Sequence, residues 1–488
     1  MLVFSTCYRP AAALLCILAP ALRAQEGDLA ERLYRSGERA YTEKAYKEAL
    51  EAWTQLVQAS PTSPYAPKAL LNLARHQVVV ELKPDAAFPF LDRLKTEYIK
   101  SPEAPEALLL MGKLLAKKAH LPGDLKDAMA EFNRVLDLYP EARACPDARL
   151  ELGRAWMLQG QWGRALQSLT DAFRLRLDPV IAPQAMLETA EVLDVMGDLP
   201  GCLRMLQNLR LQFPDRPEAQ EASWRMAVRV KHRIQKPALS NDGPWPTGRV
   251  KWLKTPTLLL ATPEGDLWIF QNDLDRTFRL REGDLAPQGP PVPGTRALVQ
   301  SQTGTLWALT KTSLIREEAP TPQPVGTLNA ISGAAMDAWG QLWIADAKTA
   351  ALTLLAPDGT HRTVASPPAS ALAALPGGMV VAADADRKLL FLDQEGQPQH
   401  IIPYGQGLSA PFRSVTALCS DGAGQVAALV DGGDFGEGVV IYGPDGTLLR
   451  QAQFKLLGIS GRITSLALDH AGALILCDRR NDLLLRLN

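Results

Sequence analysis

The chain has 488 residues, and its 52 lysines and arginines against 53 aspartates and glutamates give a formal charge of −1. This balance argues against nucleic-acid binding by bulk charge, because proteins that bind in that way carry a marked basic excess. Since 47% of the residues are hydrophobic and 22% are charged, the chain as a whole is not disordered. Its length is that of two large domains or about three average ones.

Residues 1–24 have the pattern of a secretory signal peptide. Arg9 supplies a positive charge, and residues 11–21 form an apolar stretch that is too short to span a bilayer as a helix. Cleavage is expected after Ala21 or Ala24, and an uncleaved anchor is the alternative. No later segment reaches ~18 uninterrupted apolar residues, so we expect no integral membrane segment after signal removal. The predicted location is the periplasm or the exterior, with outer-membrane association as an open alternative.

Residues 26–234 are predicted to be helical, because apolar residues recur there at helical spacing. Gly or Pro interrupts the pattern roughly every 35 residues, which indicates a repeat. Gly37, Ala49, Trp53 and Pro61 mark the first unit. Small residues at the first two positions let paired helices approach closely, the aromatic residue fills the gap, and the proline ends the second helix.

This pattern resembles the tetratricopeptide repeat, a helix–turn–helix unit of 34 residues. The second unit departs from it, with Pro89 inside the expected second helix, and residues 217–234 are predicted to be a capping helix. A narrower resemblance is to the exported repeats of bacterial envelope-assembly proteins. The five expected repeats cover residues 28–61, 63–102, 103–140, 146–178 and 179–214.

Residues 235–248 contain three prolines and two glycines and are predicted to be a linker between two domains. Beyond the linker, one sequence motif recurs six times: a turn that contains glycine, followed by an apolar strand. The six glycines are Gly265, Gly304, Gly340, Gly378, Gly424 and Gly472. Six units of about 40 residues predict a six-bladed β-propeller over residues 249–488.

Further details repeat in register in the second half. The second strand of four units ends in aspartate, and the carboxylate is expected to accept hydrogen bonds from the following turn. These residues are Asp346, Asp384, Asp431 and Asp478. Together with the Asp478–Asn481 turn, they resemble the NHL repeat. The sixth unit has only three strands, so we expect residues 250–254 to supply its fourth and close the ring.

The sequence contains no HExxH, GxSxG, Walker or GxGxxG motif, so no catalytic, cofactor-binding or metal-binding residue is predicted. Some six-bladed propellers are lactonases or hydrolases with a metal in the channel. Here the acidic residues of the predicted inner strands fall at the strand ends, beside the turns. Residues 431–438 could bind calcium through their carboxylates, but a polar hairpin is the preferred interpretation. A propeller enzyme acting on a small lactone or sugar remains the alternative function.

Two surfaces are predicted to bind partners. At the start of the inner strands, Arg296, Arg413 and Arg462 lie on three blades, with Phe412 beside one of them, and are expected to form a basic ring for an anionic group. Solvated loop arginines are the alternative interpretation.

The second surface is the concave groove of the helical repeat, which the resemblance identifies as a peptide site. Its candidate residues are Tyr34, Glu38, Tyr41, Asn72 and Arg75, with Lys113 and Arg154 farther along. The first three share one helix face.

The sequence therefore predicts a multidomain protein, an all-α helical-repeat solenoid followed by an all-β six-bladed propeller. The expected function is that of an exported, non-catalytic scaffold for protein–protein interaction. One protein partner, or a peptide segment of it, is expected in the solenoid groove, and another protein or a glycan on the propeller.

Overall fold

The computed structural model describes most of the chain after the predicted signal peptide, which lies outside the described residues. The described ranges are 29–119, 122–246, 253–262, 265–281, 284–287, 292–301, 304–317, 319–325, 328, 330–356, 359–375, 378–408, 410–421, 423–469 and 472–488. The chain falls into two compact units. One consists of residues up to Lys118 together with Leu125–Glu151, and the other of Ala119–Asp124 with Leu152–Asn488.

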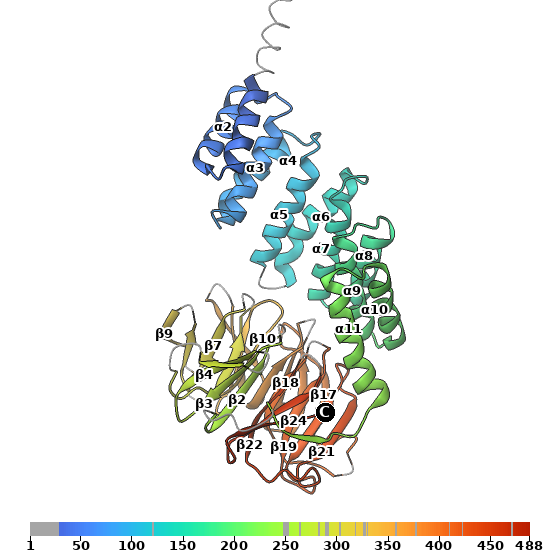
Figure 1. Ribbon diagram of the computed structural model, residues 1–488, viewed down its shortest axis with the longest axis vertical. Coiled ribbons are helices and arrows are strands. Elements are labelled where there is room, and N and C mark those ends of the chain that lie inside the picture. Colours follow the sequence, from blue (N-terminus) through green and yellow to red (C-terminus); the bar gives the residue numbers. More distant parts are fainter. Residues whose placement is uncertain are drawn as a thin grey trace, which may run out of the picture. The chain divides into compact units, whose positions relative to one another are not determined.

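The first half is helical, as predicted, and Figure 1 shows its paired helices in blue to green. Residues 29–42 form the helix before α2. The following helices are α2 (Tyr46–Ala59), α3 (Ala66–Val79), α4 (Phe88–Thr96), α5 (Ala104–Lys118), α6 (Leu125–Leu138), α7 (Cys145–Leu158), α8 (Trp162–Arg174), α9 (Ile181–Val195), α10 (Leu199–Gln212) and α11 (Pro217–Arg229), with the short turns η1 (Pro84–Ala87), η2 (Pro122–Asp124) and η3 (Val230–Gln235). None of the described helices is both long and apolar enough to cross a membrane.

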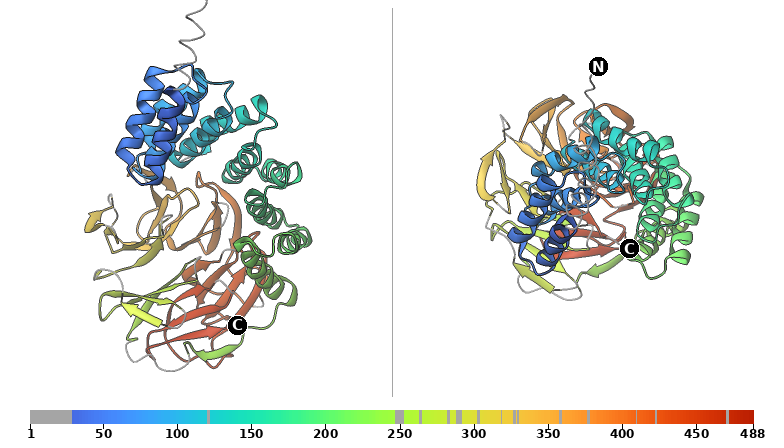
Figure 2. Two further views of the ribbon diagram at one scale, coloured as in Figure 1. Left: turned by 45° about the horizontal axis from the view of Figure 1, so that its top comes forward. Right: turned by 90° about the horizontal axis from the view of Figure 1, so that it is seen from above.

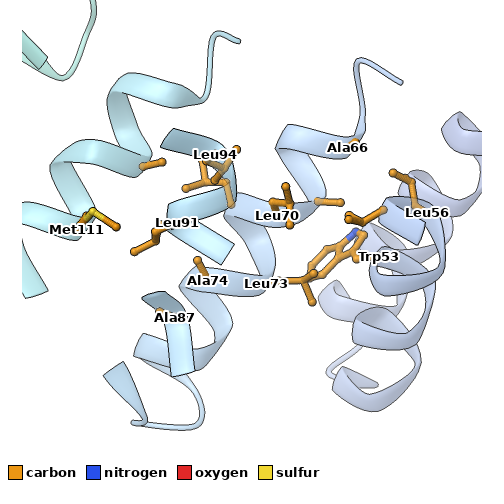
Figure 3. Packing of buried hydrophobic residues seen from close by; sticks show 14 of the residues in the cluster. Trp53, Leu56, Ala66, Leu70, Leu73, Ala74, Ala87, Leu91, Leu94 and Met111 are labelled. Carbon is orange, nitrogen blue, oxygen red and sulfur yellow. The ribbon is translucent and has the colours of Figure 1, made fainter. Parts of the chain in front are cut away.

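The residues that marked the repeat lie against one another in the helix pairs. A Cβ atom built on Gly37 would lie 2.4 Å from Nε1 of Trp53, so the absence of a side chain makes room for the indole. The indole is buried, and Figure 3 shows it pointing from α2 toward Leu70 and Leu73 of α3. The predicted reason for the spacing is therefore confirmed.

The second repeat departs from the pattern in a way that its proline explains. Pro89 occupies the first turn of α4, where a missing N–H costs nothing, and the chain before it forms the short turn η1. Pro89 thus lies at the start of the second helix rather than in its interior.

The second half forms six four-stranded antiparallel sheets within the described residues. Blades one to three are β2 (Pro256–Ala261), β3 (Leu267–Gln271), β4 (Arg276–Arg281) and β5 (Asp284–Pro287); β6 (Ala297–Gln300), β7 (Leu306–Leu309), β8 (Ser313–Arg316) and β9 (Ala319–Pro324); β10 (Ile331–Met336), β11 (Leu342–Asp346), β12 (Ala351–Leu355) and β13 (His361–Ala365). Blades four to six are β14 (Ala369–Ala374), β15 (Val380–Asp384), β16 (Lys388–Leu392) and β17 (Pro398–Pro403); β18 (Ser414–Ser420), β19 (Val426–Asp431), β20 (Gly438–Tyr442) and β21 (Leu448–Gln453); β22 (Ile463–Leu468), β23 (Leu474–Asp478), β24 (Leu483–Leu487) and β1 (Asn241–Pro244).

The first strands of successive blades contact one another, and β22 contacts β2, so the six sheets close into a ring. Closure by a strand from before blade one was predicted, but the predicted segment, residues 250–254, was wrong. The outer strand of blade six is β1, which pairs antiparallel with β24 and lies inside the range predicted to be a linker. Figure 2 shows the light green β1 beside the red C-terminal strand in both views.

The aspartates at the ends of the second strands act as turn caps in three of the four predicted blades. Asp346 accepts from the N–H of Lys348 at 2.8 Å, Asp384 from that of Lys388 at 2.7 Å, and Asp478 from that of Arg480 at 3.1 Å. In blade one, which lacks the aspartate, the Oε1 atom of Gln271 accepts from the N–H of Lys254 at 2.7 Å. In blades one, three and six the same side chain also accepts from the backbone just before the first strand, and so ties the turn to it.

Candidate functional site

The first candidate surface of the solenoid lies on the helix of residues 29–42. The Tyr34 hydroxyl donates to Oε1 of Glu38 at 2.8 Å, and the Tyr34 ring lies 5.4 Å from the ring of Tyr65. Burial, together with the Glu38 carboxylate, raises the pKa of Tyr34 to about 12, while a hydrogen bond with Asn72 acts the other way. The structure thus brings Tyr34, Glu38 and Asn72 together.

Tyr41 shares the helix face with these residues but serves the core as well. Its ring lies 5.3 Å from Trp53 and 5.7 Å from His76, which is fully buried. Tyr41 is half-buried, and burial raises its pKa. Its main contacts are therefore with the helix pair itself.

The cations predicted to face a peptide are instead paired with the next repeat. Arg75 of α3 forms an ion pair with Glu106 of α5, 31 residues later. Such pairs link first helices in successive repeats, so these charges are already engaged within the helical region. The same arrangement recurs with a spacing of 34 residues for Lys113 with Asp147, at 2.7 Å, and for Arg154 with Glu188, at 2.6 Å.

The ion pairs at the end of the helical region are buried. Arg229 of α11 donates from Nε to Asp194 at 2.8 Å and from Nη2 to Glu191 at 2.9 Å, and its side chain is 1% exposed. Its two carboxylate partners belong to α9, the preceding first helix. A charge that is buried and fully bonded in this way fixes the register of the capping helix.

On the propeller, the three predicted arginines lie at equivalent places. Arg296, Arg413 and Arg462 are exposed and each immediately precedes a first strand, β6, β18 and β22 respectively. They belong to blades two, five and six, so two of them are on neighbouring blades. Phe412 is a correction: it is 2% exposed and its ring lies 4.8 Å from Tyr404, so it belongs to the core rather than to a binding surface.

Blade six carries two further arginines that the sequence analysis did not identify as binding residues. Arg479 and Arg480 follow β23, and the Arg479 N–H donates to the carbonyl of Arg462 at 3.0 Å. The two arginine segments therefore lie side by side at one end of the blade. Both residues were visible in the turn Asp478–Asn481, but only the hydrogen bond places that turn beside Arg462.

A second feature was missed altogether: a hydroxyl residue at a β-bulge in five of the first strands. The register shifts at Thr257, Ser332, Ser370, Thr416 and Thr464. Ser332 donates to the carbonyl of Ala369 in the next blade at 2.6 Å, and Ser370 to that of Val415 at 2.8 Å. Ser332, Ser370 and Thr464 thus link neighbouring blades, whereas Thr257 and Thr416 donate to carbonyls of their own blades. The signal for the five hydroxyls was Ser or Thr near the start of the inner strand.

The acidic residues at the strand ends are engaged in the turns between first and second strands. Asp337 accepts from the N–H groups of Trp339 and Gln341, both at 2.9 Å, and from Nε1 of Trp343 at 2.7 Å. Asp421 accepts from Nε2 of Gln425 at 2.7 Å. Burial raises the pKa of Asp421 to about 6. Within the described ranges, no group of three or more His, Cys, Asp or Glu side chains is placed to hold a metal ion.

The glycine-rich loop between β19 and β20 is held by an aromatic residue. Phe435 is 4% exposed and its ring lies 6.4 Å from that of Phe412. Asp434 and Glu437 are exposed on either side of it. The loop is thus anchored through Phe435, in keeping with a hairpin.

Comparison with known proteins gives a family match within the helical half. The tetratricopeptide repeat family matches residues 106–142, which include most of α5 and all of α6. Comparison with curated proteins gives no match. The family match indicates protein partners.

Solved structures similar to this chain include propellers and a repeat protein. Virginiamycin B lyase from Staphylococcus aureus has a TM-score of 0.37 and 10% identity, over 51% of this chain and 87% of that one. A gluconolactonase from Xanthomonas campestris has a TM-score of 0.37 and 15% identity, over 46% and 81%. PilW, a type IV pilus biogenesis factor, has a TM-score of 0.32 and 21% identity, over 41% and 86%.

These likenesses concern the fold alone. A tetratricopeptide-type helical repeat region is followed by a six-bladed β-propeller. Both are folds that suggest a scaffold for protein interaction.

Proposed function

We propose that the protein is an exported, non-catalytic scaffold in which the solenoid groove binds a segment of one protein and the propeller binds a second. Export rests on the predicted signal at residues 1–24, and places the mature chain in the periplasm or outside the cell. Association with the outer membrane is part of the same proposal.

The proposed solenoid site rests on one observation: the residues expected to line the groove are aromatic near its start and paired charges farther along. From the second repeat onward, charged groove residues such as Arg75 and Lys113 pair with the following repeat. Before Arg75 along the chain, the Tyr34 and Tyr65 rings, with Asn72 beside them, occupy this face. Half-buried tyrosines offer contact area at little cost in side-chain entropy, which favours binding of an extended segment there.

The non-catalytic part of the proposal is supported by the state of the acidic residues. Asp337 and Asp421, at the ends of inner strands, accept hydrogen bonds from their own turns. Each carboxylate therefore stabilises the turn to which it belongs. A stoichiometric divalent ion in the purified protein, together with hydrolysis of a lactone, would instead favour the propeller enzyme.

The groove is tested by photo-crosslinking at matched positions. Lys68 is exposed, with Nζ 5.5 Å from the centre of the Tyr65 ring, and Glu51 is exposed on α2. A photo-reactive residue at position 68 is expected to give a defined protein adduct in envelope extracts, whereas one at position 51 gives none. The adduct should disappear when Tyr34 and Tyr65 are changed to Ser, with melting of the variant checked by circular dichroism.

Equal labelling at positions 68 and 51 would contradict the groove site. Export is tested separately by sequencing the N-terminus of the protein recovered from the envelope fraction. A start after Ala21 or Ala24 is expected, and an intact Met1 in the cytoplasm would contradict export.

A further inference from the structure

The rim of blade six concentrates positive charge. Arg462 and Arg480 are exposed and Arg479 is half-buried, and the hydrogen bond from Arg479 to Arg462 keeps the three together. Within the described part of the chain, none of these guanidinium groups forms an ion pair. We call Arg462, Arg479 and Arg480 the blade-six patch.

The carboxylates nearest in sequence to the blade-six patch are used by backbone groups. Asp478 is 2% exposed and accepts from the N–H groups of Arg462 at 3.2 Å and Asn481 at 3.2 Å. Asp482 accepts from the N–H of Thr255 at 2.7 Å. Because these acids face the main chain, the three guanidinium groups are left for solvent or for a partner.

The arginines on blades five and two do not extend the positive charge of the blade-six patch. Arg413 has the equivalent position on the adjacent blade five, but its own turn brings Asp431, Asp434 and Glu437, all of them exposed. Arg296 lies on blade two, which is separated from blade six by blade one. The expected basic ring is therefore a patch on one side of the rim.

The hydroxyls at the bulges of the first strands do not favour an anion inward of the rim. Ser332 and Ser370 give their protons to carbonyls of the next blade, so they present acceptor oxygens. Thr464 of blade six likewise donates to the carbonyl of Pro256, at 3.5 Å. Acceptor oxygens repel an anion, so a small acid gains nothing by moving inward from the arginines.

We propose that the blade-six patch binds an acidic segment of a protein that lies across the propeller rim. This rests on the proposed function, and names the chemistry of the second partner. Guanidinium groups recognise carboxylates through paired hydrogen bonds, and several spaced arginines suit several side-chain carboxylates on one chain. The aromatic rings nearest Arg413, Phe412 and Phe435, are buried, so they offer no exposed face on which a sugar could stack.

The test compares two variants that lose equal charge from the same end of the propeller. The patch variant is Arg462→Ser, Arg479→Ser and Arg480→Ser. The control variant changes residues in the equivalent turns of blades two, three and four: Lys311→Ser, Lys348→Ser and Arg387→Asn. Asn is chosen at position 387 because its φ of 64° lies in the left-handed region.

Binding of a fluorescent oligoglutamate peptide to the full chain is measured by anisotropy at low and at high salt. The patch variant is expected to bind roughly tenfold more weakly at low salt, since exposed charge pairs are individually weak and three are removed. The difference should shrink at high salt, where screening acts on both proteins. The control variant should bind nearly as well as the wild type, and oligoglutamine should not bind.

Each other outcome overturns the proposal. An equal loss in the control variant would mean diffuse attraction, and no binding of oligoglutamate by the wild type would mean no acidic site. Patch-dependent binding of alginate without binding of oligoglutamate would assign the patch to an anionic glycan. A large fall in melting temperature of the patch variant would make the arginines structural. None of these results affects crosslinking at position 68, which tests the scaffold function independently.

Discussion

At the residue scale, close packing of the helix pairs depends on a few positions where no side chain is tolerated. A Cβ atom on Gly112 would lie 2.5 Å from the Phe132 ring, and one on Gly153 would lie 2.5 Å from Leu169. Together with Gly37 and Trp53, these contacts show the same small-against-large pairing in three repeats. A methyl group at such a place must displace a ring or a leucine side chain that already fills the interior.

We therefore predict that Gly37→Ala destabilises the protein by roughly 1–3 kcal/mol, the usual cost of overpacking. Gly163 is the matched control, because it also lies in a helix, α8, but a Cβ atom there meets nothing within 4 Å. Gly163→Ala is expected to be neutral or stabilising by up to about 1 kcal/mol, since Ala favours the helix. Chemical denaturation of both variants measures the difference, and an equal effect would refute the packing argument.

At the element scale, β1 supplies the strand that completes blade six. Ser240 and Asn488 exchange backbone hydrogen bonds of 3.1 and 3.2 Å, and the N–H of Trp245 donates to the carbonyl of Leu484 at 2.9 Å. Leu239, next to the strand, is buried with Leu485 and Leu487. This short segment thus covers an edge that would otherwise be open to other chains.

The role of β1 predicts a difference between two propeller fragments. A fragment of residues 236–488 keeps the strand, whereas one of residues 246–488 leaves β24 as an exposed edge. The shorter fragment should melt at a lower temperature and aggregate as its concentration is raised. Thermal melting and light scattering measure this, and identical behaviour of the two fragments would show that the closing strand is dispensable.

At the scale of the whole molecule, the second compact unit includes both the later helices and the propeller. His232 of η3 is fully buried, and Nη1 of Arg450 in β21 lies 2.7 Å from its Nδ1 atom. A Cβ atom on Gly472 would lie 2.4 Å from Nε2 of the same ring. Nearby, Lys231 donates to Asn488 at 3.2 Å. The end of the helical region is thus packed into blades five and six.

This junction predicts a dependence of stability on pH. Burial, with Arg450 and Lys231 nearby, lowers the pKa of His232 from 6.5 to about 4. Between these values the unfolded chain binds more protons than the folded one, so stability is full above pH about 6.5 and is lost as pH falls toward 4. The loss from this group is up to about 3 kcal/mol.

Denaturation curves between these pH values measure the effect. His232→Gln should flatten the dependence, because Gln can accept from Arg450 without titrating. His400→Gln, at an exposed position on β17, should leave it unchanged. If the two variants gave the same slope as the wild type, the junction would not govern acid stability.

Features of the fold that repeat along the chain could be predicted from the sequence. Helix pairs with Gly and Trp or Phe at set distances, and turns with Gly before an apolar strand, are local patterns that each unit shows again. Asp346 and Asp478 were predicted as turn caps for the same reason, since a carboxylate meets N–H groups only a few residues away. Repetition turned weak local signals into a reliable architecture.

Other features depended on pairings that only the tertiary structure brings about. Residues 241–244 have little strand propensity, and they form β1 because the free edge of β24 lies beside them. Arg75 looked available to a peptide, but its partner is 31 residues away, and Arg479 lies beside Arg462 only after blade six has formed. The sequence by itself determined which units form, because their signals lie within each unit. The tertiary structure decided which charges remain free and which edge is covered, because those depend on contacts between units.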